Sequence, residues 1–211
     1  STLRHTLFPY TTLFRSCIIN SWEKMKNFIV PIDFSEDSLK GLEIAILISR
    51  YQYTNIQMVY VMKKSGDYSA SIDEEKKYAE RKFEELLTEY SPKLENDSKL
   101  RYIIKSGKIF AEIVHQAHSY KNSIIAASTH GASGFEEFFI GSNAFKIISA
   151  TKQPVITIRK GYVPEAINKI ILPINPVIES RQKVPYTVEL ARLFNAEIDV
   201  ISVCTGKDKK V

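Results

Sequence analysis

The chain has 211 residues, of which 44% are hydrophobic and 25% are charged, a composition typical of one globular domain with some additional chain. Its net charge is +5, and because Lys and Arg are interleaved with Glu, the pattern favours a solvated surface over a nucleic-acid-binding stripe. No apolar run is long enough to span a membrane, and Cys17 and Cys204 lie too far apart to form a metal-binding motif, so we expect a reduced, cytoplasmic setting.

The first 24 residues lack the pattern of a folded segment. Residues 6–16 resemble the translation of a common sequencing adapter, have no amphipathic period and are interrupted by Pro9. Arg4 and Arg15 bracket the run, which is not the layout of a signal peptide. We therefore interpret residues 1–24 as a non-native segment, the alternative being a disordered tail, and expect the native sequence to begin at Met25.

From residue 25 to residue 160, short apolar runs alternate with stretches of helical periodicity. The runs predict strands at residues 27–33, 56–62, 100–104, 123–127 and 154–158. The stretches between them predict helices, whose apolar faces are Leu39, Leu42, Ala45 and Ile46; Ala79, Phe83, Leu86, Leu87 and Tyr90; Phe110, Ile113, Val114 and Ala117; and Ala144, Ile147 and Ile148. Such alternation favours right-handed βαβ units, so the sequence predicts an α/β fold in which helices cover both faces of a doubly wound, five-stranded parallel sheet.

After residues 161–166, which their Gly and Pro mark as a linker, the pattern of the first strand begins again. An offset of 142 residues (173 − 31) is shared by several pairs, Pro31 and Pro173, Arg50 and Arg192, and Ile56 and Ile198. The expected helix face of this second copy is Val184, Val188 and Ala191. Residues 167–211 therefore predict a truncated second domain of strand, helix and strand, which we interpret as part of a tandem protein encoded by an incomplete gene fragment.

The segment from Ser128 to Ser142 joins the fourth strand to the last helix and contains Gly131, Gly134 and Gly141. It has no Gly-Lys-Ser/Thr, and its glycines are spaced wrongly for a dinucleotide-binding fingerprint. Glycines let an anion approach the backbone closely, and Gly141-Ser142 would place N–H groups, the positive end of a helix and a hydroxyl beside a phosphate. The pattern indicates a phosphate site, with ordinary turn glycines as the alternative.

The spacing of this loop resembles that of the universal stress protein family, in which glycine, two residues, glycine, nine residues and a third glycine precede serine or threonine. Gly131, Gly141 and Ser142 match that pattern, and His130 precedes the second glycine. Ser128 stands where the first glycine would be, which departs from the pattern at one backbone position. The resemblance implies a Rossmann-like sheet with strand order 3-2-1-4-5 and a nucleotide-binding loop.

The resemblance covers residues 25–160 and implies nucleotide-contacting residues at strand ends and in the loop. The expected set is Pro31, Ile32, Asp33, Val61, Ala127, Ser128, His130, Gly131, Gly141, Ser142 and Asn143. Within it, Asp33 would accept hydrogen bonds from the nucleoside, Val61 would pack against adenine and His130 would approach a phosphate. The alternatives are an Asp33 that only caps a turn, a Val61 that belongs to the core and a loop histidine bonded to nearby backbone.

The sequence lacks the residues that would mark a catalyst. No lysine stands where a γ-phosphate would need one, no paired carboxylates mark a Mg²⁺ site convincingly, and no Ser/His/Asp arrangement is visible. We therefore expect a stress-response sensor or regulatory module that binds ATP or AMP, with Mg²⁺ as a candidate companion, and not an enzyme. Its expected protein partner is a second copy of the chain or the other domain of the tandem. The alternatives are a slow ATPase, an adenylyltransferase and a nucleotide-free interaction domain.

Overall fold

The computed structural model describes residues 26–62, 69–129, 142–159, 164–175 and 181–202. The expectations for residues 1–24 concern a segment outside these ranges. The described chain divides into two compact units, one within Met25–Ile167 and one that begins at Asn168. This division lies close to the expected linker, residues 161–166.

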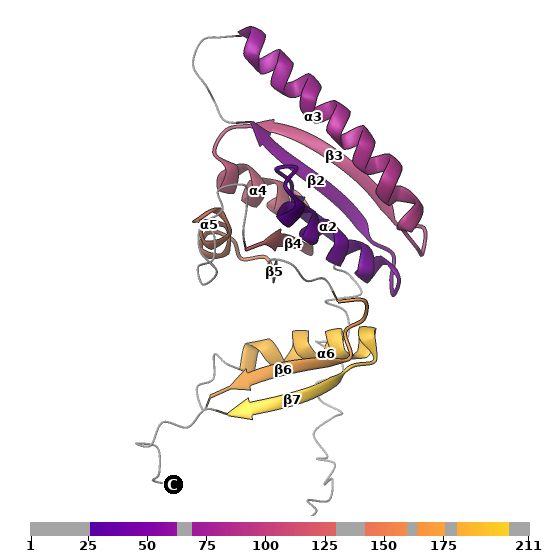
Figure 1. The fold of residues 1–211 in the computed structure, drawn as a ribbon. Helices are drawn as coiled ribbons and strands as arrows, with labels where there is room; N and C mark the ends of the chain where they lie inside the picture. Colours follow the sequence, from indigo (N-terminus) through magenta and orange to yellow (C-terminus); the bar gives the residue numbers. More distant parts are fainter. Residues whose placement is uncertain (1–25, 63–68, 130–141, 160–163, 176–180, 203–211) are drawn as a thin grey trace, which may run out of the picture. The chain divides into compact units, whose positions relative to one another are not determined.

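The first unit is a five-stranded parallel sheet with helices between successive strands. Its strands are β1 (Asn27–Pro31), β2 (Asn55–Met62), β3 (Lys99–Ser106), β4 (Ser123–Ser128) and β5 (Val155–Ile158), and its helices are α2 (Glu36–Ser49), α3 (Ser69–Tyr90), α4 (Ile109–His118) and α5 (Ser142–Ala150). The strand order is β3-β2-β1-β4-β5, and every neighbouring pair is parallel (Figure 1). The predicted doubly wound α/β fold and its strand order are confirmed.

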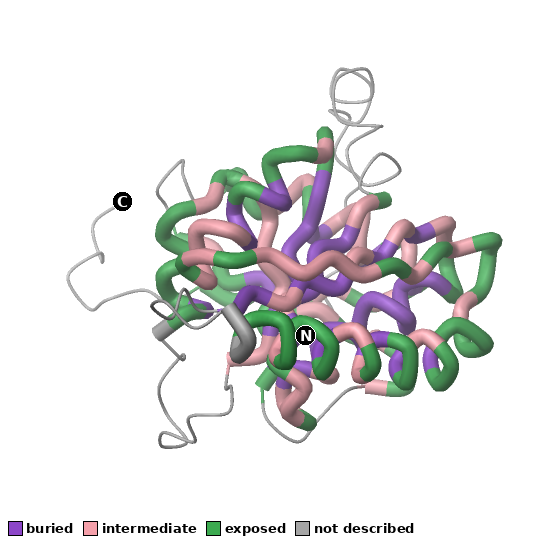
Figure 2. Tube along the Cα trace, turned by 90° about the horizontal axis from the view of Figure 1, so that it is seen from above, coloured by how far each residue is buried: buried purple, intermediate pink, exposed green. Residues whose placement is uncertain are grey.

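Helices cover both faces of this sheet. The chain runs from β1 to β3 in one direction along the sheet and from β4 to β5 in the other, so right-handed crossovers place α2 and α3 on one face and α4 and α5 on the other (Figure 1). A cluster of buried aliphatic residues lies beneath α4 and α5, and it includes Ile29, Val59, Ile113, Ile125 and Ile147. Figure 2 shows how buried residues, in purple, concentrate on the inner elements while the outer helix turns are exposed.

Local signals explain where the helices of this unit begin and end. Ser35 caps α2, because its Oγ accepts a hydrogen bond from the backbone N–H of Ser38 at 3.2 Å. The long helix α3 ends at Tyr90, where Pro92 lies in a short 3₁₀ turn. Asn96 follows in the left-handed conformation, with φ at 54°, and turns the chain towards β3.

The buried face of α5 is narrower than predicted. Ala144 and Ile147 are 5% and 2% exposed, as expected for residues that face the sheet. Ile148 is 39% exposed, so the prediction that it shares this face is wrong. At about 100° per residue, Ile148 lies on the opposite side of Ala144 from Ile147, so the stripe that contacts the core ends between Ala144 and Ile148.

The second unit repeats the first two strands with the same pairing. It consists of β6 (Lys169–Ile174), α6 (Lys183–Phe194) and β7 (Glu197–Ser202), and β6 and β7 are parallel. Lys169 pairs with Glu197, which is 142 residues beyond the pair Asn27 and Asn55. The backbone hydrogen bond at the start of each strand pair also repeats. The N–H of Asn55 donates to the carbonyl of Lys26 at 2.6 Å, and the N–H of Glu197 donates to the carbonyl of Asn168 at 2.9 Å. The sequence offset therefore extends to the register of the strands.

The two units differ in how far equivalent strand residues are buried. In the first unit, the side chains of Ile29, Met58 and Val59 are 0%, 0% and 1% exposed. Their equivalents at the offset of 142 residues are Ile171, Val200 and Ile201, which are 60%, 62% and 46% exposed. α6 takes the place of α2, but α3, α4 and α5 have no counterpart among residues 164–175 and 181–202, so this apolar surface stays accessible.

The buried face of α6 also differs from the prediction. Thr187, Ala191 and Phe194 are buried, whereas Val184 and Val188 are only partly buried. Two strands present a narrower surface than a complete sheet, so only a narrow stripe of the helix is covered. The helix ends at Asn195, which adopts the left-handed conformation at φ 52°.

Candidate functional site

The candidate site lies at the carboxyl ends of β1 and β4, where the strand order of the first unit reverses. The β1–β4 ladder extends only as far as Ile29 and Ile125. By contrast, the β1–β2 ladder reaches Pro31 and the β4–β5 ladder reaches Ser128. In open parallel sheets, ligands bind beyond the strand ends at such a reversal point. This geometry brings the expected strand-end residues of β1 and β4 to one edge of the sheet.

The end of β1 is hydrogen-bonded to β2, which fixes the position of the backbone just before Asp33. Pro31 is the last residue of β1, and Ile32 is buried with its N–H donating to the carbonyl of Val59 at 2.9 Å. Asp33 is exposed. Its Oδ1 accepts hydrogen bonds from the backbone N–H of Ser35 at 3.1 Å and from the Ser35 hydroxyl at 2.5 Å. The turn-capping alternative for Asp33 is therefore realised, and the nucleoside contact stays a prediction for the same exposed carboxylate.

Val61 and Ala127 lie in the core at this edge. Val61 is 8% exposed and Ala127 is 4% exposed, and both belong to the cluster beneath α4. Because Pro31 pairs with Val59, Val61 lies at the level of Asp33 along the strands. Burial supports the core role of Val61, and adenine packing at this position stays a prediction.

The end of β4 is held by β5. Ser128 pairs with Ile158, and the next residue, Thr129, donates its N–H to the carbonyl of Ile158 at 2.8 Å. The Thr129 hydroxyl donates to the same carbonyl at 3.3 Å. The chain therefore leaves the sheet at Thr129 from a fixed position, and the loop of interest begins there.

Part of the expected loop lies outside the described residues. His130, Gly131 and Gly141 fall in this part, so their predicted contacts are untested. Ser142 is the first residue of α5, and Asn143 is exposed in its first turn. This first turn carries no acidic residue, which leaves the positive end of α5 without a carboxylate of its own to compete with a phosphate. The described residues therefore place an exposed carboxylate after β1 and the start of a helix after β4, both at the carboxyl end of the sheet.

Sequence reasoning missed an aromatic group beside Asp33. Phe34 follows Asp33 directly, and its ring lies 5.0 Å from that of Tyr60 on β2. The Tyr60 hydroxyl donates a hydrogen bond to Oε1 of Glu75 on α3 at 2.8 Å. Burial, with the Glu75 carboxylate as a second cause, raises the pKa of Tyr60 to about 12. Alternation along a strand places Tyr60 on the same face as Met58, but no local signal in the sequence links Tyr60 to Glu75 on α3.

Tyr60 and Tyr90 are expected to ionise later than ordinary tyrosines. Burial is the main cause that raises the pKa of each to about 12, from a usual value of about 10. The folded state disfavours the ionised form, so this contribution to stability is fully present below about pH 10 and is lost as the pH rises through about 12. Ultraviolet absorbance of tyrosinate should show a late phase in the folded protein, and urea should remove it. Tyr60→Phe should reduce that phase, and an unchanged late phase would contradict the assignment.

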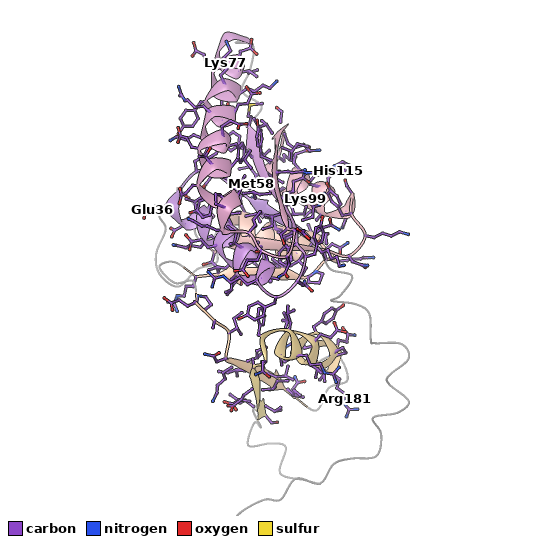
Figure 3. All side chains as sticks on the ribbon, turned by 90° about the vertical axis from the view of Figure 1, so that its right-hand side faces the viewer. Glu36, Met58, Lys77, Lys99, His115 and Arg181 are labelled. Carbon is purple, nitrogen blue, oxygen red and sulfur yellow. The ribbon has the colours of Figure 1, made fainter. Side chains whose placement is uncertain are left out.

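Membrane-spanning helices and metal-binding clusters are both absent from the described part of the chain. None of its helices is both long enough and apolar enough to cross a membrane. No group of three His, Cys, Asp or Glu side chains within residues 26–62, 69–129, 142–159, 164–175 and 181–202 could hold a metal ion. A shallow hollow on α3 is lined by Arg81, Glu84, Glu85, Thr88 and Glu89, and its three carboxylates make it unsuitable for a phosphate. Figure 3 shows Met58 among the side chains inside the first unit, whereas Glu36, at the start of α2, lies at its periphery.

Comparisons with known proteins agree with this architecture. A model described as the universal stress protein family matches residues 24–159. The universal stress protein MJ0531 of Methanocaldococcus jannaschii is 26% identical over 159 residues, which cover 70% of this chain and 90% of the relative. A solved universal stress protein from Archaeoglobus fulgidus DSM 4304 is 21% identical with a TM-score of 0.72, and the match covers 88% of this chain and 70% of that one. A universal stress protein solved in complex with cAMP is 15% identical with a TM-score of 0.50, over 64% of this chain and 97% of that one.

Proposed function

Since the chain belongs to the universal stress protein family, we propose that its first unit binds an adenine nucleotide, ATP or AMP, where β1 and β4 end. The observation that carries the proposal is the arrangement at this edge of the sheet. The β1–β4 ladder stops at Ile29 and Ile125, Asp33 is exposed beyond β1, and α5 begins at Ser142. A nucleotide could then place its nucleoside near Asp33 and its phosphates at the start of α5.

Two further points support an adenine nucleotide as the ligand. The loop from Ser128 to Ser142 has the glycine spacing of the family, apart from Ser128 itself. One structural neighbour of the same family was solved with cAMP, an adenine nucleotide. Neither point identifies the number of phosphates, so ATP and AMP are the ligands to compare, with Mg²⁺ a candidate companion of ATP.

We propose that the protein acts by binding in a stress response and not by catalysis. The described residues offer no cluster of acidic side chains for a metal ion, and residues 31–34 contain no histidine of the kind that an adenylyltransferase would need. A slow ATPase and a nucleotide-free interaction domain are the competing functions. A cytoplasmic location, and partnership with a second copy or a tandem domain, are part of the same proposal.

We further propose that residues 167–211 are part of a second domain of the same kind. Its support is the repeated register, since β6 and β7 pair as β1 and β2 do. Asn175 takes the place of Asp33 in this copy, so the equivalent strand end carries no charge. The first unit is therefore the better candidate for nucleotide binding.

A thermal-shift titration with ATP, AMP and GTP tests the proposed nucleotide site. Wild type should be stabilised in a concentration-dependent way by ATP or AMP, because ligand binds the folded state only. Gly141→Val should abolish the shift, since a branched side chain would keep a phosphate away from the backbone amides. Asp33→Asn should weaken it while keeping an acceptor for Ser35, and Ser142→Ala should have a smaller effect than Gly141→Val.

Matched controls separate these effects from damage to the fold. Gly134→Val changes a glycine of the same loop that lies outside the family spacing, and Asp37→Asn removes a neighbouring charge in the first turn of α2. Both should keep the wild-type shift. Equal shifts in wild type and Gly141→Val would show that this loop is not the nucleotide site, and no shift in either would leave the nucleotide-free interaction domain as the better function. Phosphate release from ATP above the rate without protein would favour the ATPase.

A further inference from the structure

Phe34 has a backbone conformation that its residue type rarely adopts. Its φ is 63°, in the left-handed region. The other described non-glycine residues with positive φ are Asn96, Asp97, Asn122 and Asn195. Asn and Asp tolerate this region because their short polar side chains bond locally, whereas a bulky side chain is strained there. Other contacts must therefore hold Phe34 in place.

The ring of Phe34 is anchored between β2 and α3. Its centroid lies 5.0 Å from that of Tyr60, 5.0 Å from that of Phe83 and 5.9 Å from that of Tyr78. Phe83 is fully buried and stacks on Tyr102 of β3 at 4.5 Å. These distances are those of attractive aromatic pairs. Phe34 therefore packs the loop that follows β1 against side chains of both β2 and α3.

Phe34 is also the central residue of the turn that fixes Asp33. The Asp33 carboxylate accepts the N–H and the hydroxyl of Ser35, on the far side of Phe34. The N–H of Asp33 donates to Oγ of Ser38 at 3.3 Å. These bonds need the chain to reverse at Phe34, so its left-handed conformation determines the direction of the carboxylate.

We propose that Phe34 is a positioning residue that links the direction of the Asp33 carboxylate to the packing of α3 on the sheet. The proposal rests on the proposed function, in which Asp33 contacts the nucleoside. The link works in both directions, because two equilibria that share one element are coupled reciprocally. A nucleotide that fixes the Asp33 turn therefore stabilises α3 around Phe83, and loosening α3 weakens nucleotide binding.

The link is tested first without ligand, by hydrogen exchange at the Ser35 amide measured by nuclear magnetic resonance. Phe34→Ala removes the ring but keeps the Cβ that disfavours positive φ, and Phe83→Leu removes its partner on α3 without touching the turn. Both should speed exchange at Ser35 about tenfold, the factor expected when the left-handed conformation loses its anchor. Leu86→Val, a change at another buried position of α3, should leave that exchange rate unchanged. Unchanged exchange at Ser35 in Phe83→Leu would overturn the proposal.

The second arm uses AMP and separates this proposal from the proposed function. In wild type, saturating AMP should slow amide exchange in α3 around Phe83. In Phe34→Ala, AMP should bind about tenfold more weakly, by the same loss of the anchored turn, and should no longer slow exchange in α3. AMP binding to wild type without slower exchange in α3 would overturn the positioning role. No AMP binding to wild type would overturn the proposed function instead, and the Ser35 result without ligand would then decide the positioning role.

Discussion

Replacing Ile29 by alanine is expected to lower the free energy of unfolding of the first unit by about 2–5 kcal/mol, the range for deleting buried aliphatic atoms and leaving a cavity. Ile29 is 0% exposed and lies in the cluster beneath α4 with Ile113 and Ile125. The strands on both sides of β1 restrict how far the site can collapse around the smaller side chain. Urea unfolding followed by circular dichroism should show the midpoint of this unit at lower urea concentration.

The internal repeat supplies a matched control for this prediction. Ile171 occupies the equivalent position on β6 but is 60% exposed. Ile171→Ala removes the same atoms from a surface position, so the change in free energy should stay within about 0.5 kcal/mol. A loss at Ile171 as large as that at Ile29 would show that the β6–β7 face is covered in solution. Light scattering would then reveal whether a second copy covers it.

Replacing Gly41 by alanine is expected to destabilise the first unit by about 1–3 kcal/mol, the range for overpacking a close-packed contact. A Cβ at this position would lie 2.6 Å from the backbone oxygen of Ala126 and 3.2 Å from Cγ1 of Val30. The backbone of β4 cannot move aside without disturbing the sheet, so α2 would have to shift. Because α2 begins just after the Asp33 turn, nucleotide binding should weaken as well.

Destabilisation by Gly41→Ala would be the opposite of the usual effect of this substitution in a helix. At an open helix position, Gly→Ala usually stabilises a protein by about 1 kcal/mol, since alanine is the better helix former. Lys40→Ala is the control, because Lys40 is the neighbouring residue and forms only a partly exposed ion pair with Glu43 at 3.0 Å. Its effect should stay within about 1 kcal/mol. A gain in thermal stability for Gly41→Ala would show that α2 does not approach β4 as closely as described.

For the candidate site, the sequence predicted where the residues lie in the fold better than it predicted which residues they contact. Asp33 and Ser128 were expected at strand ends, and the strand order brings those two strand ends to one edge of the sheet. The role of Asp33 in its turn was foreseen only as an alternative. Phe34 was not foreseen at all, because its conformation depends on Phe83 and Tyr60, which come from other elements.

The sequence by itself determined the type and order of the elements in the first unit, since apolar periodicity and turn residues act over a few neighbouring positions. It also determined the repeat, because an offset that places Pro173 on Pro31 carries the strand register with it. Only the tertiary structure decided which of two equivalent residues is buried. Ile29 is covered by α4, which comes from a distant part of the chain, whereas Ile171 has the same local pattern and is exposed. Burial depends on which helices pack against a strand, so it cannot be predicted from the local sequence pattern alone.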